Sequence, residues 1–227
     1  MYPLTAAQIE ELKAIDTPTV CNAIEKFKIR PRVQGFTGMD IRCLLPELGV
    51  MVGYAVTVTV DSTTEGIPQE AQAWLDWMNA MAASPKPVVV VFKDVGPTPR
   101  KSAHLGEVMA TLAARLGTVG VITDGGLRDI LEVKAVGLQC FAKGLVPSHG
   151  NPRLIKVGVP VTIDGLTIQP GDLLHGDANG VTAIPREIAD QVAQAANQVR
   201  ADEAVTMNYI RSADFTVEGY QKRRFSH

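Results

Sequence analysis

The stretch PKPVVVVFKDVGPTPRKSAHLGEVMATLAARLGTVGVITDGGLRDILEVKAVGLQCFAK (residues 85–143) decides the fold of this chain. It contains three apolar runs separated by two amphipathic segments that carry apolar residues at helical spacing. The runs are residues 86–92, 119–123 and 138–143, and the amphipathic segments are residues 105–116 and 127–136. A continuous apolar run of this length is typical of a strand buried on both faces. Strands that alternate with helices over short connections pair in parallel through right-handed crossovers, so the stretch predicts a helix-covered parallel sheet.

The chain before this stretch predicts two short helices and a strand. Thr5 and Gln8 have the spacing of a capping box at the start of the first helix. Thr17 is the expected cap of a second helix, with Pro18 at its first helical position. Residues 50–60 alternate in a pattern that predicts a strand with one buried face.

A longer helix is expected over residues 68–83. Trp74, Trp77 and Met81 lie on one side of it, and we interpret this stripe as core packing rather than as a cofactor site.

The last third predicts antiparallel strands and a final helix. Residues 159–163 and 166–168 flank an Asp-Gly turn and predict a hairpin. The segment His175–Gly180 has turn composition and is expected to be a loop before a strand at residues 181–184. Pro185 introduces a long amphipathic helix. We therefore predict a mixed α/β protein of a single domain, residues 1–227, with N-terminal helices at about 5–28 and a C-terminal helix and tail at about 186–227.

Composition restricts the class of protein. The net charge of −2 argues against nucleic acid as the main partner, since such partners usually require a basic face. Three widely spaced cysteines, Cys21, Cys43 and Cys140, predict reduced, buried thiols. We expect a cytoplasmic protein without a leader or a membrane partner, because the N-terminus has no apolar core and no apolar run is long enough to span a bilayer. The basic residues 222–224 are expected in a solvated tail.

Polar residues follow the predicted parallel strands at their carboxyl ends, where ligands collect in such sheets. They are Lys93-Asp94, Gly106-Glu107 and the segment Asp124-Gly-Gly-Leu-Arg128-Asp129. Glu107 and the Arg128-Asp129 pair are expected in the first turns of two successive helices, where N–H groups favour an anion.

These residue types suit a short oxo-acid and a metal ion. The planar Arg128 guanidinium can bind a carboxylate through two hydrogen bonds. Asp129, with Glu107 nearby, can hold a hard cation that keeps some of its waters. Taken singly, acidic residues at a helix start are common capping devices, and an adjacent Arg-Asp is usually a surface pair. Their convergence at one sheet edge, with glycines at 106, 125 and 126 that let a ligand approach the backbone, favours a site.

The segment GEVMATLAARLGTVGVITDGGLRD (residues 106–129) resembles the signature of the RraA-like family. That family includes class II pyruvate aldolases acting on 4-hydroxy-4-methyl-2-oxoglutarate and 4-carboxy-4-hydroxy-2-oxoadipate. Its aldolases carry an acidic residue, twenty further residues and then Arg-Asp, which Glu107, residues 108–127 and Arg128-Asp129 match. The common form has Asp at the first position, so Glu107 is a departure. Further resemblance lies at residues 17–24, 141–144, 170–172 and 176–181.

The resemblance implies layered α/β/β/α architecture and assembly into homotrimers or homohexamers with sites near subunit interfaces. It implies that Arg128 binds the pyruvyl carboxylate, assisted by backbone donors of the turn Gly106-Glu107-Val108-Met109. Asp129 would anchor Mg²⁺ or Mn²⁺, with Glu107 as a further ligand or as the base. The implied reaction is metal-dependent retro-aldol cleavage that releases pyruvate, with oxaloacetate decarboxylation as a companion activity.

Other polar residues have weaker arguments. His104 precedes the site turn and is a candidate to contact the distal part of the substrate or to carry a proton. Lys143 and Arg153 are candidates for a second carboxylate, although solvated surface positions explain them as well. His175 and Asp177 are best explained by turn formation, and His149 has no evident partner.

Two other functions stay open from the sequence. Some RraA-like proteins regulate ribonuclease activity by binding protein, and a lyase or isomerase acting on another oxo-acid has the same requirements as an aldolase. The intact acidic and Arg-Asp motif favours an enzyme, because a binding module needs no such charges in a glycine-lined turn. Loops 61–70, 93–104 and 146–153 are expected to recognise the far end of the substrate.

Overall fold

The structure is a computed structural model that describes residues 2–225. Its centre is an eight-stranded mixed sheet with the order β1-β6-β4-β3-β2-β11-β12, and β8 pairs with the far end of β2. The strands are β1 (Arg42–Cys43), β2 (Met51–Val60), β3 (Val88–Asp94), β4 (Thr118–Thr123), β6 (Gln139–Ala142), β8 (Leu154–Val157), β11 (Leu173–Asp177) and β12 (Gly180–Ile184). Strands β2, β3, β4 and β6 are parallel to one another, whereas the remaining strands pair antiparallel. The predicted combination of parallel and antiparallel portions is confirmed.

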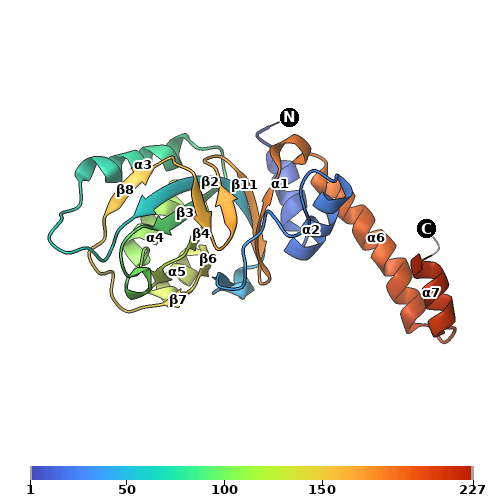
Figure 1. The fold of residues 1–227 in the computed structure, drawn as a ribbon. Coiled ribbons are helices and arrows are strands. Elements are labelled where there is room, and N and C mark those ends of the chain that lie inside the picture. The colour runs from blue at the N-terminus through green and yellow to red at the C-terminus, as the bar shows by residue number, and fades with distance from the viewer. Residues whose placement is uncertain (1, 226–227) are drawn as a thin grey trace.

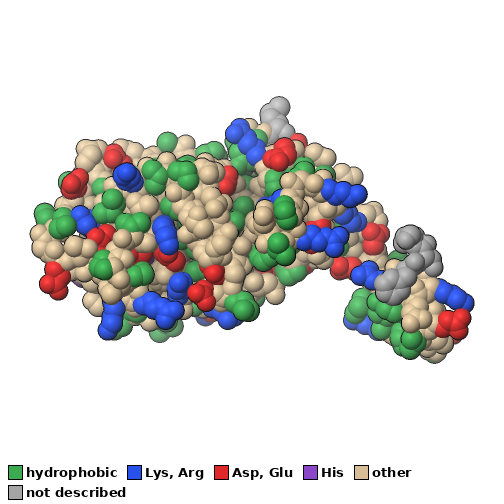
Figure 2. Space-filling model, viewed as in Figure 1, with side chains coloured by type: hydrophobic (Ala, Val, Ile, Leu, Met, Phe, Trp, Pro, Cys, Tyr) green, Lys and Arg blue, Asp and Glu red, His purple; other side chains and the backbone are tan. Residues whose placement is uncertain are grey.

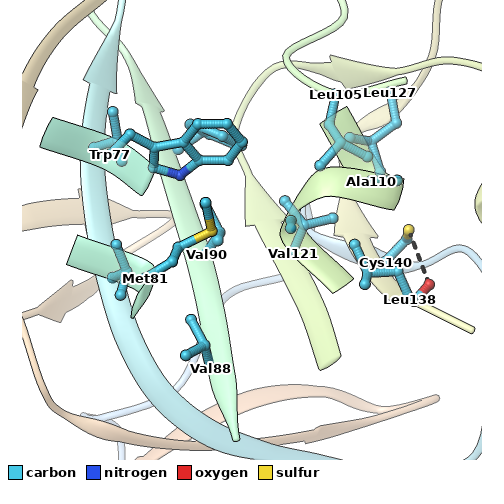
Figure 3. Close-up of a cluster of buried hydrophobic side chains, with 14 of the residues drawn as sticks. Trp77, Met81, Val88, Val90, Leu105, Ala110, Val121, Leu127, Leu138 and Cys140 are labelled. Carbon is cyan, nitrogen blue, oxygen red and sulfur yellow. Dashed lines mark hydrogen bonds between the residues drawn. The ribbon is translucent and has the colours of Figure 1, made fainter. Parts of the chain in front are cut away.

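Helices α3 (Ala71–Ala83), α4 (Glu107–Arg115) and α5 (Ile130–Val136) cover one face of the parallel portion (Figure 1). Trp77 and Met81 of α3 are fully buried and pack with Val88 and Val90 of β3, as Figure 3 shows. The tryptophan and methionine stripe therefore belongs to the core, as predicted. The helix begins at Ala71, so residues 68–70 lie outside it.

Strand β2 is buried on both faces, so the prediction of one buried face is wrong. Val56, Val58 and Val60 face the cluster under α3 and α4, whereas Met51 and Ala55 face a second cluster. The second cluster is formed with a hairpin of β9 (Val161–Ile163) and β10 (Leu166–Ile168) that covers the opposite face of the sheet. Alternation in β2 therefore separates two packed faces rather than core from solvent.

The β9–β10 hairpin turns at Asp164 and Gly165, whose positive φ values of 44° and 84° confirm the predicted Asp-Gly turn. A second hairpin, β11–β12, corrects an expectation. His175 lies in β11, pairs with Val52 and Thr182, and is fully buried, whereas the sequence had placed it in a loop.

Helices α1 (Ala6–Lys13) and α2 (Thr17–Lys26) lie beside β11 and β12 (Figure 1). The Thr5–Gln8 capping box is present at α1. The cap of α2 is Asp16 rather than Thr17, because the Asp16 carboxylate accepts the Thr19 N–H. Thr17 binds the second hairpin instead, through its N–H to Asp177 at 2.8 Å and its hydroxyl to His175 at 3.0 Å.

Helix α6 (Val192–Arg211) packs on α2 through its first half and then extends away from the body (Figures 1 and 2). Helix α7 (Val217–Phe225) lies against its far end. The basic residues 222–224 are exposed, as expected for a solvated segment, and they lie in this helix. Residues 226 and 227 of the predicted tail lie outside the described chain.

The cysteines are free thiols, of which Cys140 is buried and Cys21 and Cys43 are half-buried. Across residues 2–225, no helix has the length and apolar character needed to cross a bilayer.

Candidate active site

A short segment of the chain joins the two predicted halves of the site. The backbone from Ser102 to Leu105 runs beside β5 (Gly126–Leu127) and is tied to it by main-chain hydrogen bonds. The bonds run from Gly126 N–H to Ser102 O (3.0 Å), from His104 N–H to Gly126 O (2.9 Å) and from Arg128 N–H to Leu105 O (3.1 Å). This register places Gly106-Glu107 against Arg128-Asp129, as predicted from the sheet edge.

Arg128 and Asp129 precede α5 instead of forming its first turn, so that expectation is wrong. Gly126 and Leu127 pair in parallel with β7 (Gly144–Leu145), which keeps the chain extended up to Arg128. Asp129 then adopts a left-handed conformation with φ 53° at the N-cap of α5, and the helix begins at Ile130. A non-glycine residue in this region carries strain, which often marks a functional position.

The Asp129 carboxylate contacts the N-terminus of α4. Its Oδ2 accepts the Glu107 N–H at 3.1 Å and lies 3.5 Å from the Arg128 Nε. Gly106 has no side chain to cap α4, and a Cβ at Gly106 would lie 2.5 Å from this same oxygen. Asp129 therefore caps α4 from another element, and Gly106 provides the space for it.

The site has remaining capacity to bind a ligand. The Arg128 and Asp129 side chains are 36% and 37% exposed, and Glu107 is exposed. Within the described chain, the N–H groups of Val108 and Met109 have no hydrogen-bond acceptor, as is usual in a first helical turn. The Met109 side chain packs on the core, so this residue can contribute only its backbone to a ligand.

The donor set at Asp129 suits a hydrated divalent cation. Among residues 2–225, no group of three or more His, Cys, Asp or Glu side chains surrounds a common point. Mg²⁺ commonly binds through one or two carboxylates while keeping waters and taking oxygens from the substrate. The Asp129 Oδ1 has no hydrogen-bond partner in the described part of the chain, so one carboxylate oxygen is available for this purpose.

His104 is not at the surface of the site, which corrects its assignment as a substrate-binding residue. Its side chain is fully buried, with Nε2 2.6 Å from Asp94 Oδ2 and Nδ1 2.6 Å from Thr123 Oγ1. The sequence did not reveal this pairing, because the three side chains meet only where β3 and β4 end side by side.

A cavity of about 300 Å³ lies on the Asp124-Gly125-Gly126 loop, two residues before Arg128. Lys143 and Arg100 line it, but Arg153 does not. Arg153 is instead 2.6 Å from the Asp61 carboxylate. Arg100, which the sequence analysis missed, has no carboxylate within ion-pair distance among the described residues, and Lys143 lies 3.7 Å from the mostly exposed Asp40.

Two further histidines, His175 and His149, lie outside the site. His175 binds Thr17 and the Leu12 carbonyl, and burial lowers its pKa below the ordinary value. His149 binds the Gly150 carbonyl through Nδ1 at 2.7 Å. Neither histidine lies on the Arg128-Asp129 turn.

The fold and the site define a layered α/β protein with an arginine–carboxylate pair at the carboxyl ends of its parallel strands. The family model described as RraA-like, Aldolase/RraA, matches residues 17–183. The chain therefore belongs to the RraA-like family.

Relatives within this family carry aldolase names. A protein of Halalkalibacterium halodurans named "Putative 4-hydroxy-4-methyl-2-oxoglutarate aldolase" is 32% identical over 97% of this chain and 98% of its own length. A protein of the same name from Ectopseudomonas mendocina is 33% identical over 39% of this chain and 56% of its own length. Aldolases are carbon–carbon lyases, so the named relatives support an enzyme of that type.

Solved structures confirm the fold. A crystal structure of an uncharacterized protein from Pseudomonas syringae pv. tomato has a TM-score of 0.74 and 27% identity, covering 97% of this chain and 95% of that one. Streptomyces coelicolor RraAS2, described as an unusual member of the RNase ES inhibitor RraA family, has a TM-score of 0.70 and 20% identity, covering 91% and 98%. The second likeness concerns the fold alone.

Proposed function

We propose that this protein cleaves a 4-hydroxy-2-oxo-dicarboxylate or tricarboxylate by a retro-aldol reaction that releases pyruvate, with a divalent cation as cofactor. The observation that carries the proposal is the contact of Arg128-Asp129 with the N-terminus of α4. A guanidinium, a carboxylate and unpaired N–H groups share one accessible surface there. The aldolase names of relatives support the same reaction class.

Arg128 and α4 together suit the pyruvyl end of the substrate. The guanidinium offers two parallel N–H donors to the carboxylate, and the N–H groups of Val108 and Met109 offer further donors at the positive end of the helix. The Arg128 N–H bonds the Leu105 carbonyl, so the backbone that carries the guanidinium keeps a fixed position relative to the helix N-terminus. Binding at two points orients the C3–C4 bond of the substrate.

Asp129 would hold the cation, with Glu107 as a possible second ligand. When bound, a divalent cation polarises the 2-oxo group and stabilises the negative charge that develops on it.

Glu107 is the candidate base. Its carboxylate is exposed at the first position of α4 and has no ion-pair partner within the described residues. It would accept the proton of the 4-hydroxyl group while the C4–O bond becomes a carbonyl and the C3–C4 bond breaks. The electron pair of that bond moves to the pyruvate enolate, and C3 then takes a proton to give pyruvate. Loss of CO₂ from oxaloacetate produces the same enolate, so decarboxylation is a companion activity of the proposal.

The cavity beside the site supports a substrate with a second carboxylate. Arg100 and Lys143 place two cations around it, and the carboxylates of Asp40 and Asp124 also line it. Asp124 is already paired with Lys93, and Lys143 lies 3.7 Å from Asp40. Arg100 has no ion-pair partner within the described chain. Gly125 and Gly126 form part of its wall and add no side-chain bulk. A 4-hydroxy-2-oxo-dicarboxylate has two carboxylates, so one can bind Arg128 while the other binds in this cavity.

A homotrimer or homohexamer is part of the proposal. Val108 and Leu131, next to Glu107 and Asp129, are 82% and 73% exposed. Apolar side chains at the edge of a polar site suit coverage by a neighbouring subunit. Sedimentation velocity of the purified protein measures the assembly directly.

The proposal is tested by incubating the purified protein and Mg²⁺ with 4-hydroxy-4-methyl-2-oxoglutarate and with oxaloacetate, and by coupling pyruvate release to lactate dehydrogenase. We expect pyruvate from both substrates, and we expect EDTA to abolish its release. If neither substrate yields pyruvate, the aldolase proposal is refuted, and regulation by protein binding becomes the favoured function. Activity that survives EDTA would refute the cation at Asp129.

Glu107 provides an internal check of the mechanism. Glu107→Asp keeps a carboxylate in the common form of the family, and we expect it to retain activity within about tenfold. Glu107→Gln removes the base, and we expect a loss of about 10²-fold or more in kcat. Equal activity of the two variants would exclude Glu107 as the base.

A further inference from the structure

A buried chain of polar groups lies directly beneath the loop that leads to Arg128. The side chains of His104 and Asp94 are both 0% exposed, and their Nε2 and Oδ2 atoms are 2.6 Å apart. The other ring nitrogen, Nδ1, lies 2.6 Å from the Thr123 hydroxyl. That hydroxyl oxygen also accepts the N–H of Gly125 at 3.1 Å. The chain therefore runs from Asp94 on β3 through His104 and Thr123 to the site loop.

The donors and acceptors of this chain are compatible along its whole length. Gly125 N–H donates to Thr123, whose hydroxyl can donate to Nδ1, and the Nε2–H donates to Asp94. Asp94 also accepts the Ser62 hydroxyl at 3.1 Å and the Gly96 N–H at 2.6 Å. Burial alone would raise the pKa of Asp94, but the hydrogen bonds that it accepts from His104, Gly96 and Ser62 hold this pKa below its ordinary value. The acceptor end of the chain is thus a stable carboxylate.

His104 holds the site loop at a second point through its backbone. Its N–H donates to Gly126 O, and the next bond in the same register joins Arg128 N–H to Leu105 O. The imidazole also fills the space beneath Gly125, where a Cβ would lie less than 3.0 Å from three ring atoms. The main chain of His104 therefore fixes the register of the loop, and its side chain fixes how closely the loop packs on the core.

We propose that His104 is a positioning residue that sets the location of Arg128 and Asp129 relative to the N-terminus of α4. It does not touch the substrate, because its side chain is fully buried. It acts through Thr123 and Gly125 on one side and through Gly126 on the other. The inference rests on the proposed function for its kinetic consequence, whereas the structural consequence for the loop stands on its own.

A second buried histidine provides a matched control. His175 has similar contacts, with Nδ1 3.0 Å from the Thr17 hydroxyl and Nε2 3.1 Å from the Leu12 carbonyl in place of a carboxylate. It is also fully buried, but it joins β11 to α1 and α2 and contacts no residue of the site loop. Loss of His175 therefore reports the general effect of removing a buried histidine from this fold.

The first arm of the experiment compares His104→Ala, His104→Asn and His175→Ala. We expect His104→Ala to lower kcat for pyruvate release by about 10²-fold in the folded enzyme, since small displacements of catalytic groups have effects of this size. His104→Asn keeps an acceptor for the Thr123 hydroxyl, and we expect its kcat to be about tenfold higher than that of His104→Ala, or more. His175→Ala should lower the thermal midpoint and leave kcat and KM unchanged.

The second arm uses the contact between His104 and Gly125. The backbone of Gly125 is not in the left-handed region, and the three atoms nearest to a Cβ placed there all belong to the imidazole. We expect Gly125→Ala to lower kcat, and we expect the double variant His104→Ala/Gly125→Ala to be no worse than His104→Ala alone. Additive losses would show that the two residues act separately and would overturn the inference.

The third arm does not depend on turnover. Hydrogen–deuterium exchange of a peptide covering residues 124–129 should be faster by about tenfold in His104→Ala than in the wild type or in His175→Ala. Unchanged exchange together with unchanged kcat and KM in folded His104→Ala would overturn the positioning role. If the wild type released no pyruvate, the proposed function would fail, and the exchange measurement alone would decide the inference.

Discussion

Two of the arginine–aspartate pairs in the described part of the chain, Arg153–Asp61 and Arg128–Asp129, are built in opposite ways. Arg153 and Asp61 approach to 2.6 Å, with side chains only 19% and 9% exposed. The second oxygen of Asp61 accepts the N–H groups of Thr63 and Thr64. Arg128 and Asp129 are 3.5 Å apart and more than a third exposed. The first pair is saturated by the protein, whereas the second keeps donors and an acceptor available for a ligand.

This difference separates stability from function. Removing one partner of a buried pair leaves an uncompensated charge and commonly costs about 3–5 kcal/mol, whereas exposed pairs contribute about 0–1 kcal/mol. The Arg153–Asp61 pair should therefore contribute to folding and the Arg128–Asp129 pair to ligand binding. The comparison would be wrong if substitutions in the Arg153–Asp61 pair mainly lowered activity and substitutions in the Arg128–Asp129 pair mainly lowered stability.

The largest effect is expected for Arg128→Ala. It removes the guanidinium that binds the substrate carboxylate in the proposed site. We expect kcat/KM for pyruvate release to fall by about 10³-fold or more, which corresponds to about 4 kcal/mol of transition-state stabilisation. The free energy of unfolding should change by less than about 1 kcal/mol, because the side chain is exposed. Urea unfolding and coupled kinetics measure the two quantities. Arg115→Ala, an exposed arginine at the other end of α4, is the control and should change neither quantity.

Arg153→Ala should show the reverse pattern. It leaves the Asp61 carboxylate without its cation, and we expect a loss of about 3 kcal/mol in the free energy of unfolding. The kcat of the folded fraction should stay within about threefold of the wild type, because neither residue lies on the Arg128-Asp129 turn. A large fall in kcat with unchanged stability would show that this pair belongs to the site.

Acid should weaken the Arg153–Asp61 pair selectively. Burial alone would raise the pKa of Asp61, but bonds from Thr64, Arg153 and Thr63 together lower it to about 2. A carboxyl whose pKa is lower in the folded state stabilises the protein above its unfolded pKa, near 4, and this stabilisation disappears as the pH falls toward 2. We expect Asp61 to account for about 2 kcal/mol of the stability lost between these values. Asp61→Asn should therefore have a shallower dependence of unfolding free energy on pH over this range, and an unchanged slope would contradict the assignment.

The sequence predicted those parts of the molecule that leave a local pattern. Val88–Asp94 forms the expected doubly buried strand, because a parallel strand with two covered faces needs apolar residues at every position. The same topology brings Gly106-Glu107 to Arg128-Asp129, because the carboxyl ends of adjacent parallel strands share one sheet edge. Periodicity and strand order therefore suffice for the sheet and for the location of the site.

Features that depend on distant partners left no such pattern. His175 has neighbours of turn composition, yet it is buried because Thr17 and Leu12, more than 150 residues away in sequence, satisfy both ring nitrogens. Asp129 precedes its helix because the two-residue strand β5 pairs with β7, and so short a strand has no periodicity to detect. His104 is buried because Asp94 and Thr123 meet it from two strands. In each case tertiary hydrogen bonds override the local preference of the segment.

The smallest effect is expected at the cavity, which extends the comparison to two less tightly paired cations. Lys143 lies 3.7 Å from the Asp40 carboxylate, and Arg100 has no ion-pair partner among the described residues. Arg100→Ala and Lys143→Ala should each raise KM about tenfold for the dicarboxylate 4-hydroxy-4-methyl-2-oxoglutarate, which corresponds to about 1.4 kcal/mol. The monocarboxylate 4-hydroxy-2-oxopentanoate has no charge for this cavity, so its KM should stay within about twofold. Lys101→Ala, an exposed cation adjacent in sequence that does not line the cavity, should leave both values unchanged. Equal effects on the two substrates would assign these cations to general electrostatic attraction, whereas a selective effect would make the cavity the part of the protein that recognises the second carboxylate.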